Sequence, residues 1–190
     1  IDDIAAEFPE LVTVVEVATS YEGRTIRLIK ISTGESRPAF WMDSGIHARE
    51  WVAPASTIYF ADQLLRNYGV DAEITELMDE MDFYILPVFN VDGYEYTWTD
   101  DRLWRKTRSP NQGSACVGTD PNRNYDYRWG EVSAGGPCTQ TFPGDSPFSE
   151  REVREVAEHM ETIPDLRAIF GIHSYGQMYM APYGFTTENN

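Results

Sequence analysis

The sequence is poor in several residue types whose scarcity narrows what the protein can do. Its 190 residues include only two cysteines and three histidines, and 15 lysines and arginines are outnumbered by 31 aspartates and glutamates. Nucleic acids and anionic membrane surfaces both favour proteins rich in Lys and Arg, so a net charge of −16 argues against either as a partner. The chain also has no apolar run of about 18 residues, the length that a membrane-spanning helix needs.

The start of the chain lacks a basic, apolar leader, and no Asn-X-Ser/Thr glycosylation site occurs anywhere. We therefore expect a soluble polypeptide in a mature or trimmed form. Its length suits one ordinary domain, and a hydrophobic content of 42% with 13% aromatic residues is enough for a packed core.

The two cysteines, Cys116 and Cys138, lie in irregular sequence rich in Gly, Ser and Pro. A disulfide between them would close a loop at a gain of about 3 kcal/mol and would indicate an oxidising compartment. The alternative is a pair of unrelated free thiols, although free cysteines are more often buried than placed in loops.

The spacing of apolar residues predicts an α/β protein. The segment 82–89 is too uniformly apolar to be half exposed, so we expect it at the centre of the sheet. On the helix at 149–163, His159 lies beside the apolar stripe, and we expect it to face solvent. We expect helices at 2–10, 54–68, 72–81 and 149–163, strands at 12–19, 25–32, 38–46, 82–89 and 166–172, and a strand or extended segment at 177–183.

Residues 90–149 form a long stretch that is rich in Gly, Pro and aromatic residues and has little regular pattern. We expect it to be irregular. A loop of that length inside a compact domain is more often functional than not.

Two of the apolar strands end in the same triplet, Gly-Ile-His, which places His47 and His173 just past a strand end. If these strands are parallel neighbours, both histidines and Glu50 meet at one edge of the sheet. Two histidines and a glutamate with an open fourth position suit a catalytic Zn²⁺. The alternative for His47 and Glu50 is a surface histidine beside a solvated carboxylate.

Three arginines, Arg49, Arg105 and Arg123, are the notable cations of this acidic chain. Guanidinium groups bind carboxylates through two parallel hydrogen bonds, so these residues are candidates for holding a substrate. The alternative for each is a surface ion pair, which contributes little to stability.

Four motifs carry a resemblance to a known family: His-Ala-Arg-Glu-Trp at 47–51, Leu-Trp-Arg-Lys-Thr-Arg at 103–108, Asp-Pro-Asn-Arg-Asn at 120–124 and Ile-His-Ser-Tyr at 172–175. In this order they resemble the zinc metallocarboxypeptidases of the pancreatic A/B type. Carboxypeptidase A is a reference example of a His₂Glu zinc site, so the ligand set is not independent of the resemblance. The fold it implies is a mostly parallel, mixed, twisted sheet flanked by helices, with residues 1–190 as one catalytic domain truncated at both ends.

The resemblance also implies a role for each matching residue. Asp120 would orient His47 from behind, and Arg105 would stabilise the oxyanion of the tetrahedral intermediate. Cys116 and Cys138 match the family's disulfide, and the Ser174–Tyr175 and Pro182–Tyr183 bonds match positions with cis peptides. The zinc ligands would be His47, Glu50 and His173; the grip on the substrate's C-terminal carboxylate would be Asn122 and Arg123; and the next subsites would be lined by Arg49, Ser174 and Tyr175.

The activity implied is that of a secreted, zinc-dependent exopeptidase acting on the C-termini of peptides and proteins. The family's general-base glutamate lies beyond residue 190, so we expect the chain alone to be inactive and to need a second chain or a missing segment. A protein inhibitor or a prosegment is a further expected partner. Two other interpretations are a noncatalytic module that binds zinc or peptide C-termini, and a related zinc deacylase that also uses His-X-X-Glu and a later histidine.

Overall fold

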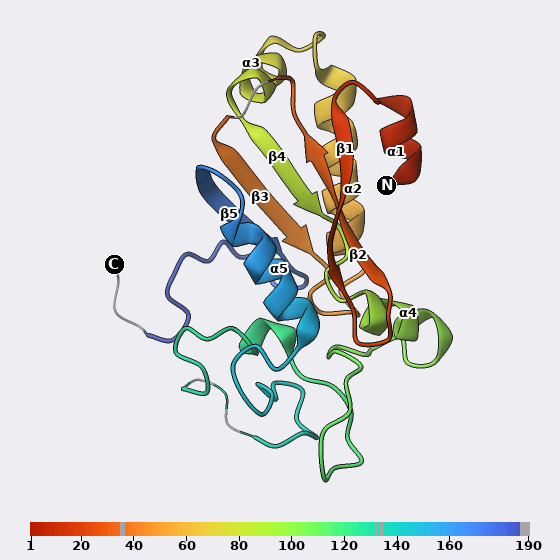
Figure 1. Cartoon of the computed structure of the whole chain (residues 1–190), viewed down its shortest axis with the longest axis vertical. Coiled ribbons are helices and arrows are strands. Elements are labelled where there is room, and N and C mark those ends of the chain that lie inside the picture. The colour runs from red at the N-terminus through yellow and green to blue at the C-terminus, as the bar shows by residue number, and fades with distance from the viewer. Residues whose placement is uncertain (35–36, 132, 134, 187–190) are drawn as a thin grey trace.

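A five-stranded mixed sheet forms the centre of the protein (Figure 1). The computed structural model describes residues 1–34, 37–131, 133 and 135–186. In the described sheet, β1–β2 and β2–β4 are antiparallel, whereas β4–β3 and β3–β5 are parallel, which confirms the mixed α/β sheet. The strand order is β1 (Val12–Thr19), β2 (Thr25–Ile31), β4 (Asp82–Leu86), β3 (Ala39–Ser44) and β5 (Leu166–Ile172).

Side chains along each strand point alternately to the two faces of the sheet, and a helix covers each face. On β4, Tyr84 and Leu86 join the core cluster that contains Val153 and Val156 of α5 (Arg151–Glu161). Phe83 and Ile85, which alternate with them along the strand, lie on the other face and pack with residues of α2 (Val52–Asn67). Figure 1 shows α5 in front of the sheet and α2 behind it. All five residues of β4 are buried, which confirms its central position.

The remaining helices follow local signals. The helices α1 (Asp2–Glu7) and α3 (Ala72–Glu80) lie close to their expected positions. Asp71 caps α3 by accepting hydrogen bonds from the first backbone N–H groups of that helix, which have no partner within it.

The expectation that residues 90–149 are irregular is wrong at two places. A helix, α4 (Val91–Thr99), follows β4 directly, and a short 3₁₀ helix spans Pro121–Arg123. The helix α4 begins because the Asn90 side chain accepts a hydrogen bond from the Gly93 N–H at 3.0 Å. It is rich in aromatic residues and has only a narrow buried face, so its apolar pattern is weak.

The expectation for His159 also fails. This residue does not face solvent: it is partly buried, and burial lowers its pKa. Its Nε2 atom is buried without a hydrogen-bond partner among the described residues. Of the two forms expected for segment 177–183, a strand or an extended segment, the structure shows no strand.

The long loop segment is held by a buried asparagine as well as by the disulfide. The Asn124 side chain donates to the Pro143 carbonyl at 2.8 Å and accepts from the Glu150 N–H at 3.0 Å, just before α5. Cys116 and Cys138 form the expected disulfide, with Cα atoms 5.1 Å apart.

Among the described helices, none combines the length and the apolar character that crossing a bilayer requires.

The central position of β4 predicts a strong dependence of stability on Leu86. Leu86 is 0% exposed, whereas Leu103 is 68% exposed. We expect Leu86→Ala to lower the free energy of unfolding by about 2–5 kcal/mol, because it leaves a cavity in the core. The matched control Leu103→Ala should change it by less than about 0.5 kcal/mol. Urea titration followed by circular dichroism measures both, and an equal loss in the two variants would contradict this packing.

Candidate metal centre

The carboxyl ends of β3 and β5 bring the two predicted histidines together. Ser44, the last residue of β3, is in register with Ile172, the last residue of β5, and His173 follows at once. His47 comes after a turn at Gly45, which has φ of +65°. A Cβ at Gly45 would lie 3.3 Å from the Val88 Cα. Glycine is therefore favoured at this position both by the backbone angle and by the lack of space.

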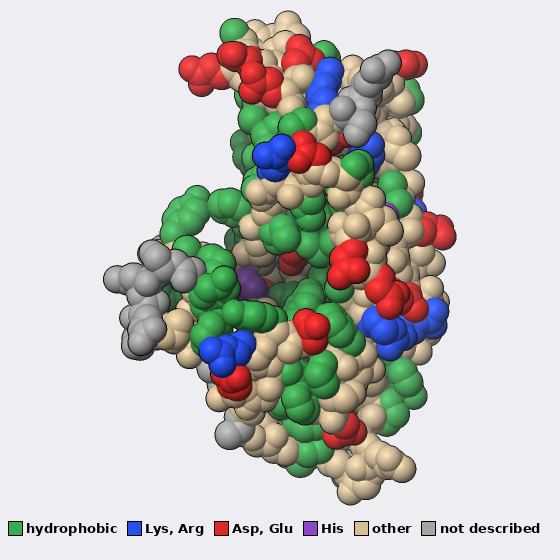
Figure 2. Space-filling view, turned by 60° about the vertical axis from the view of Figure 1, so that its left-hand side comes forward, with side chains coloured by type: hydrophobic (Ala, Val, Ile, Leu, Met, Phe, Trp, Pro, Cys, Tyr) green, Lys and Arg blue, Asp and Glu red, His purple; other side chains and the backbone are tan. Residues whose placement is uncertain are grey.

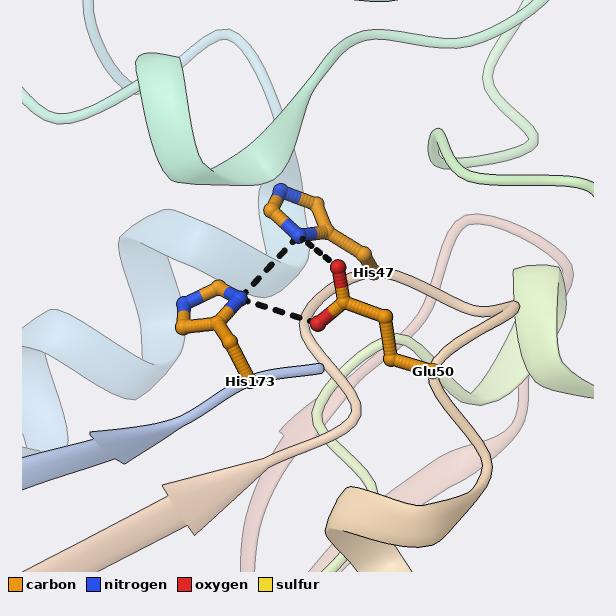
Figure 3. A group of neighbouring side chains, drawn as sticks. All are labelled: His47, Glu50 and His173. Atoms are coloured by element: carbon orange, nitrogen blue, oxygen red, sulfur yellow. Dashed lines mark hydrogen bonds and ion pairs between the residues drawn. The ribbon is translucent and has the colours of Figure 1, made fainter. Parts of the chain in front are cut away.

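Three side chains converge at this edge (Figure 3). The Nδ1 atoms of His47 and His173 lie 3.2 Å apart. The two carboxylate oxygens of Glu50 lie 2.9 Å from His47 Nδ1 and 3.0 Å from His173 Nδ1. The ligand atoms of the three residues all lie within 4.8 Å of one another. The sequence prediction that these residues meet is therefore confirmed.

The spacing of these atoms fits a zinc ion. Two histidine nitrogens at the usual Zn–N distance in a tetrahedral site lie about 3.3 Å apart, close to the 3.2 Å found here. Two imidazoles and one carboxylate are also the donor types that zinc prefers. His173 keeps 32% of its side chain exposed, which leaves the cluster open on one side. Figure 2 shows a histidine side chain at the bottom of a hollow flanked by hydrophobic side chains.

Glu50 is held in its ionised form. Burial alone would raise the pKa of this carboxyl group, but the hydrogen bonds to His173 and His47 outweigh it and lower the pKa to about 2. The Ser174 N–H also donates to Glu50 Oε2 at 3.2 Å. An ionised carboxylate is the form that binds a metal ion.

Asp120 lies directly behind His47, as the resemblance implies. Its Oδ1 atom is 3.0 Å from His47 Nε2, and its Oδ2 atom accepts a hydrogen bond from Arg105 Nη2 at 2.8 Å. Burial would raise the pKa of Asp120, but His47 and Arg105 lower it below the usual value. When Nε2 donates to this carboxylate, the lone pair of Nδ1 points towards the metal position.

Two of the residues predicted to act on a substrate also lie beside the cluster. Arg105 Nη1 is 3.9 Å from Glu50 Oε1, and Asn122 Nδ2 is 3.5 Å from His173 Nε2. Arg123 is adjacent, with its Nη1 atom donating to the Asn122 carbonyl at 2.8 Å. The loop segment from residue 100 to 149 thus places Arg105 and Asn122 beside the metal cluster, with Arg123 next to Asn122.

The other three predicted substrate residues lie at the border of the site. Arg49 extends from the turn between the ligands His47 and Glu50, and its Nη1 atom donates to the Leu103 carbonyl at 3.4 Å. Ser174 contacts Glu50 through its backbone, and the Tyr175 side chain is 99% exposed. The Ser174–Tyr175 peptide bond is cis, as is Pro182–Tyr183. The subsite roles of these residues stay predictions.

One residue that organises the site was not predicted. Asn90 donates from Nδ2 to the Lys106 carbonyl at 2.9 Å and to the Ile46 carbonyl at 3.4 Å, which joins the loop of His47 to the loop of Arg105. A Cβ on Gly93 would lie 2.7 Å from the Lys106 carbonyl oxygen, so the first turn of α4 requires glycine. The available signal was Asn-Val-Asp-Gly directly after the central strand, a pattern that favours a helix start.

Comparison with known proteins gives consistent matches. The family model described as zinc carboxypeptidase matches residues 1–190. Carboxypeptidase B of Homo sapiens is 45% identical over 193 residues, covering 98% of this chain and 46% of its own length. Carboxypeptidase A1 of Rattus norvegicus is 44% identical over 189 residues, with 98% and 45% covered.

Among solved structures, bovine thrombin-activatable fibrinolysis inhibitor in complex with tick carboxypeptidase inhibitor superposes with a TM-score of 0.90 and 38% identity. The match covers 100% of this chain and 62% of that one. The chain spans about half the length of the curated relatives it matches.

The convergence of three ligands predicts that His173 is needed for metal binding and His159 is not. We expect His173→Ala to lose stoichiometric zinc, because only His47 and Glu50 then remain to hold it. The matched control His159→Ala, on α5, should retain one zinc per chain. Equilibrium dialysis followed by atomic absorption measures both, and full zinc content in His173→Ala would rule out this ligand set.

Proposed function

The chain belongs to the zinc carboxypeptidase family, and on that premise we propose that it carries the metal centre of an exopeptidase that removes the C-terminal residue of peptides and proteins. The observation that carries this proposal is the convergence of His47, Glu50 and His173 beside Arg105 and the pair Asn122–Arg123. The metal ligands and the candidate groups for binding a carboxylate then lie together at the edge of the sheet where β3 and β5 end.

His47, Glu50 and His173 would hold the zinc. A bound Zn²⁺ would supply a Lewis acid that polarises a carbonyl and lowers the pKa of a coordinated water. The protein's own groups do the rest of the positioning. Asp120 keeps His47 in one orientation, while Arg105 has guanidinium N–H groups beside Glu50 that are placed to stabilise an oxyanion.

The grip on the substrate comes from Asn122 and Arg123. A cavity of about 560 Å³ lies beside them, lined in part by Tyr125, Tyr127 and Trp129. A free C-terminal carboxylate at its entrance would form two parallel hydrogen bonds with the Arg123 guanidinium. A substrate held by its terminal carboxylate is cut one residue from its end, which defines an exopeptidase.

We also propose that further polypeptide covers β5 and supplies the general base. β5 is the last strand of the described sheet, with Ile169 58% exposed, and near it Met180 is 81% exposed. Such apolar side chains beside an open strand edge suit coverage by a segment outside residues 1–190 or by a second chain. Glu50 is held by the two histidines and Asp120 by His47 and Arg105, so neither carboxylate is free to act as the base.

A protein inhibitor is a further proposed partner, since a structural relative is seen with tick carboxypeptidase inhibitor. We propose a secreted location as well. The Cys116–Cys138 disulfide supports it, because disulfides persist in oxidising compartments and are rare in the cytosol.

The terminal carboxylate clamp is tested with two substrates that differ by one group. The zinc-loaded protein, purified from its natural source, should release the last residue of a peptide with a free C-terminus. It should leave the amidated peptide intact. Arg123→Ala should lower kcat/KM for the free peptide roughly 10- to 100-fold, because hydrogen bonds to a charged group are lost. Quantifying the released amino acid by chromatography measures these rates.

The matched control is Arg128→Ala, which removes an arginine that lines the same cavity but pairs with Glu131. Its kcat/KM should stay close to that of the unchanged protein. Equal cleavage of the free and amidated peptides would contradict the clamp. Peptide binding without any turnover would instead favour the noncatalytic binding module.

A further inference from the structure

A second carboxylate besides Asp120, that of Asp43, lies near His173. Asp43 is in β3, in register with Gly171 of β5, and therefore points to the same face of the sheet as Gly171 and His173. The Cβ position of Gly171 would lie 3.9 Å from Asp43 Oδ1 and 4.0 Å from His173 Nε2. Because glycine has no side chain, these two polar atoms border the same small space.

The hydrogen bonds of Asp43 leave one oxygen available. Trp41 Nε1 donates to Oδ2 at 2.9 Å, which fixes the orientation of the carboxylate. Among the residues that the structure describes, no donor contacts Oδ1. This oxygen borders the space that Gly171 leaves beside His173.

His173 needs an acceptor at that position. Its Nδ1 atom faces Glu50 and His47, so a metal ion held there leaves the proton of the neutral ring on Nε2. Among the described residues, the polar atom in contact with Nε2 is Asn122 Nδ2, at 3.5 Å, and an amide nitrogen is itself a donor. With the Asn122 amide in this orientation, the Nε2–H group has no hydrogen-bond acceptor among the described residues.

We propose that Asp43 is a positioning residue for His173: its Oδ1 atom accepts the His173 Nε2–H, directly or through one water molecule, as Asp120 does for His47. Each imidazole ligand then has its own carboxylate behind it, one from β3 and one from the loop before the 3₁₀ helix. The inference rests on the proposed zinc site. It is tested by metal binding and not by peptide hydrolysis, so the two proposals can fail separately.

The test is Asp43→Asn at pH 8, with zinc affinity measured by competition with a chromophoric chelator. An asparagine oxygen can still accept from Trp41 Nε1, so the thermal unfolding of the metal-free protein should be unchanged. Loss of the charge should weaken zinc binding roughly 10- to 100-fold, the usual effect of losing a carboxylate behind a metal-binding histidine. The matched control Asp165→Asn, at an exposed ion pair with Arg167, should bind zinc as the unchanged protein does.

A second measurement starts from the unchanged protein and so does not depend on the folding of a variant. In the zinc-loaded, unchanged protein with ¹⁵N-labelled histidine rings, the Nε2-bound proton of His173 should give a resolved, slowly exchanging signal, which Asp43→Asn moves or removes. The chain has only three histidines, so assignment is direct. Absence of this signal in the unchanged protein would overturn the proposal. So would unaltered zinc affinity in Asp43→Asn together with a loss in Asn122→Ala, which would make Asn122 the partner.

Discussion

The parallel pairing of β3 and β5 is the constraint on which the rest of the structure depends. It brings the ends of two strands that are more than a hundred residues apart in the chain into register, Ser44 beside Ile172. Two imidazoles and a carboxylate then meet with their ligand atoms within 4.8 Å of one another. Groups this close compete unless a cation or shared protons hold them, and two imidazoles with one carboxylate are the donor types that zinc prefers.

Buried polar contacts around the cluster keep the ligands in place. Asp120 is fully buried and contacts His47 and Arg105 at once, while Asn90 joins the loops that carry these two residues. A carboxylate that already contacts two such groups is a fixed part of the site and not a mobile base. On the proposed function, proton transfer then falls to a group outside these contacts.

Much of the fold and the centre of the site could be predicted because their signals are local. The strand ends at His47 and His173 follow long apolar runs, and the Gly-Ile-His triplets mark the turn out of each strand. Asp120 was reached only through the resemblance, since nothing in its spacing points to His47. Asn90 and α4 were missed because their importance comes from contacts with Ile46 and Lys106, which are set by tertiary packing.

The account's central claim is that His47, Glu50 and His173 together hold one zinc ion. X-ray absorption at the zinc edge of the loaded protein tests it most directly. The account predicts a first shell of nitrogen and oxygen only, at about 2.0–2.2 Å, with the outer-shell scattering of two imidazole rings. Sulfur in the first shell, or scattering from fewer than two imidazoles, would contradict it.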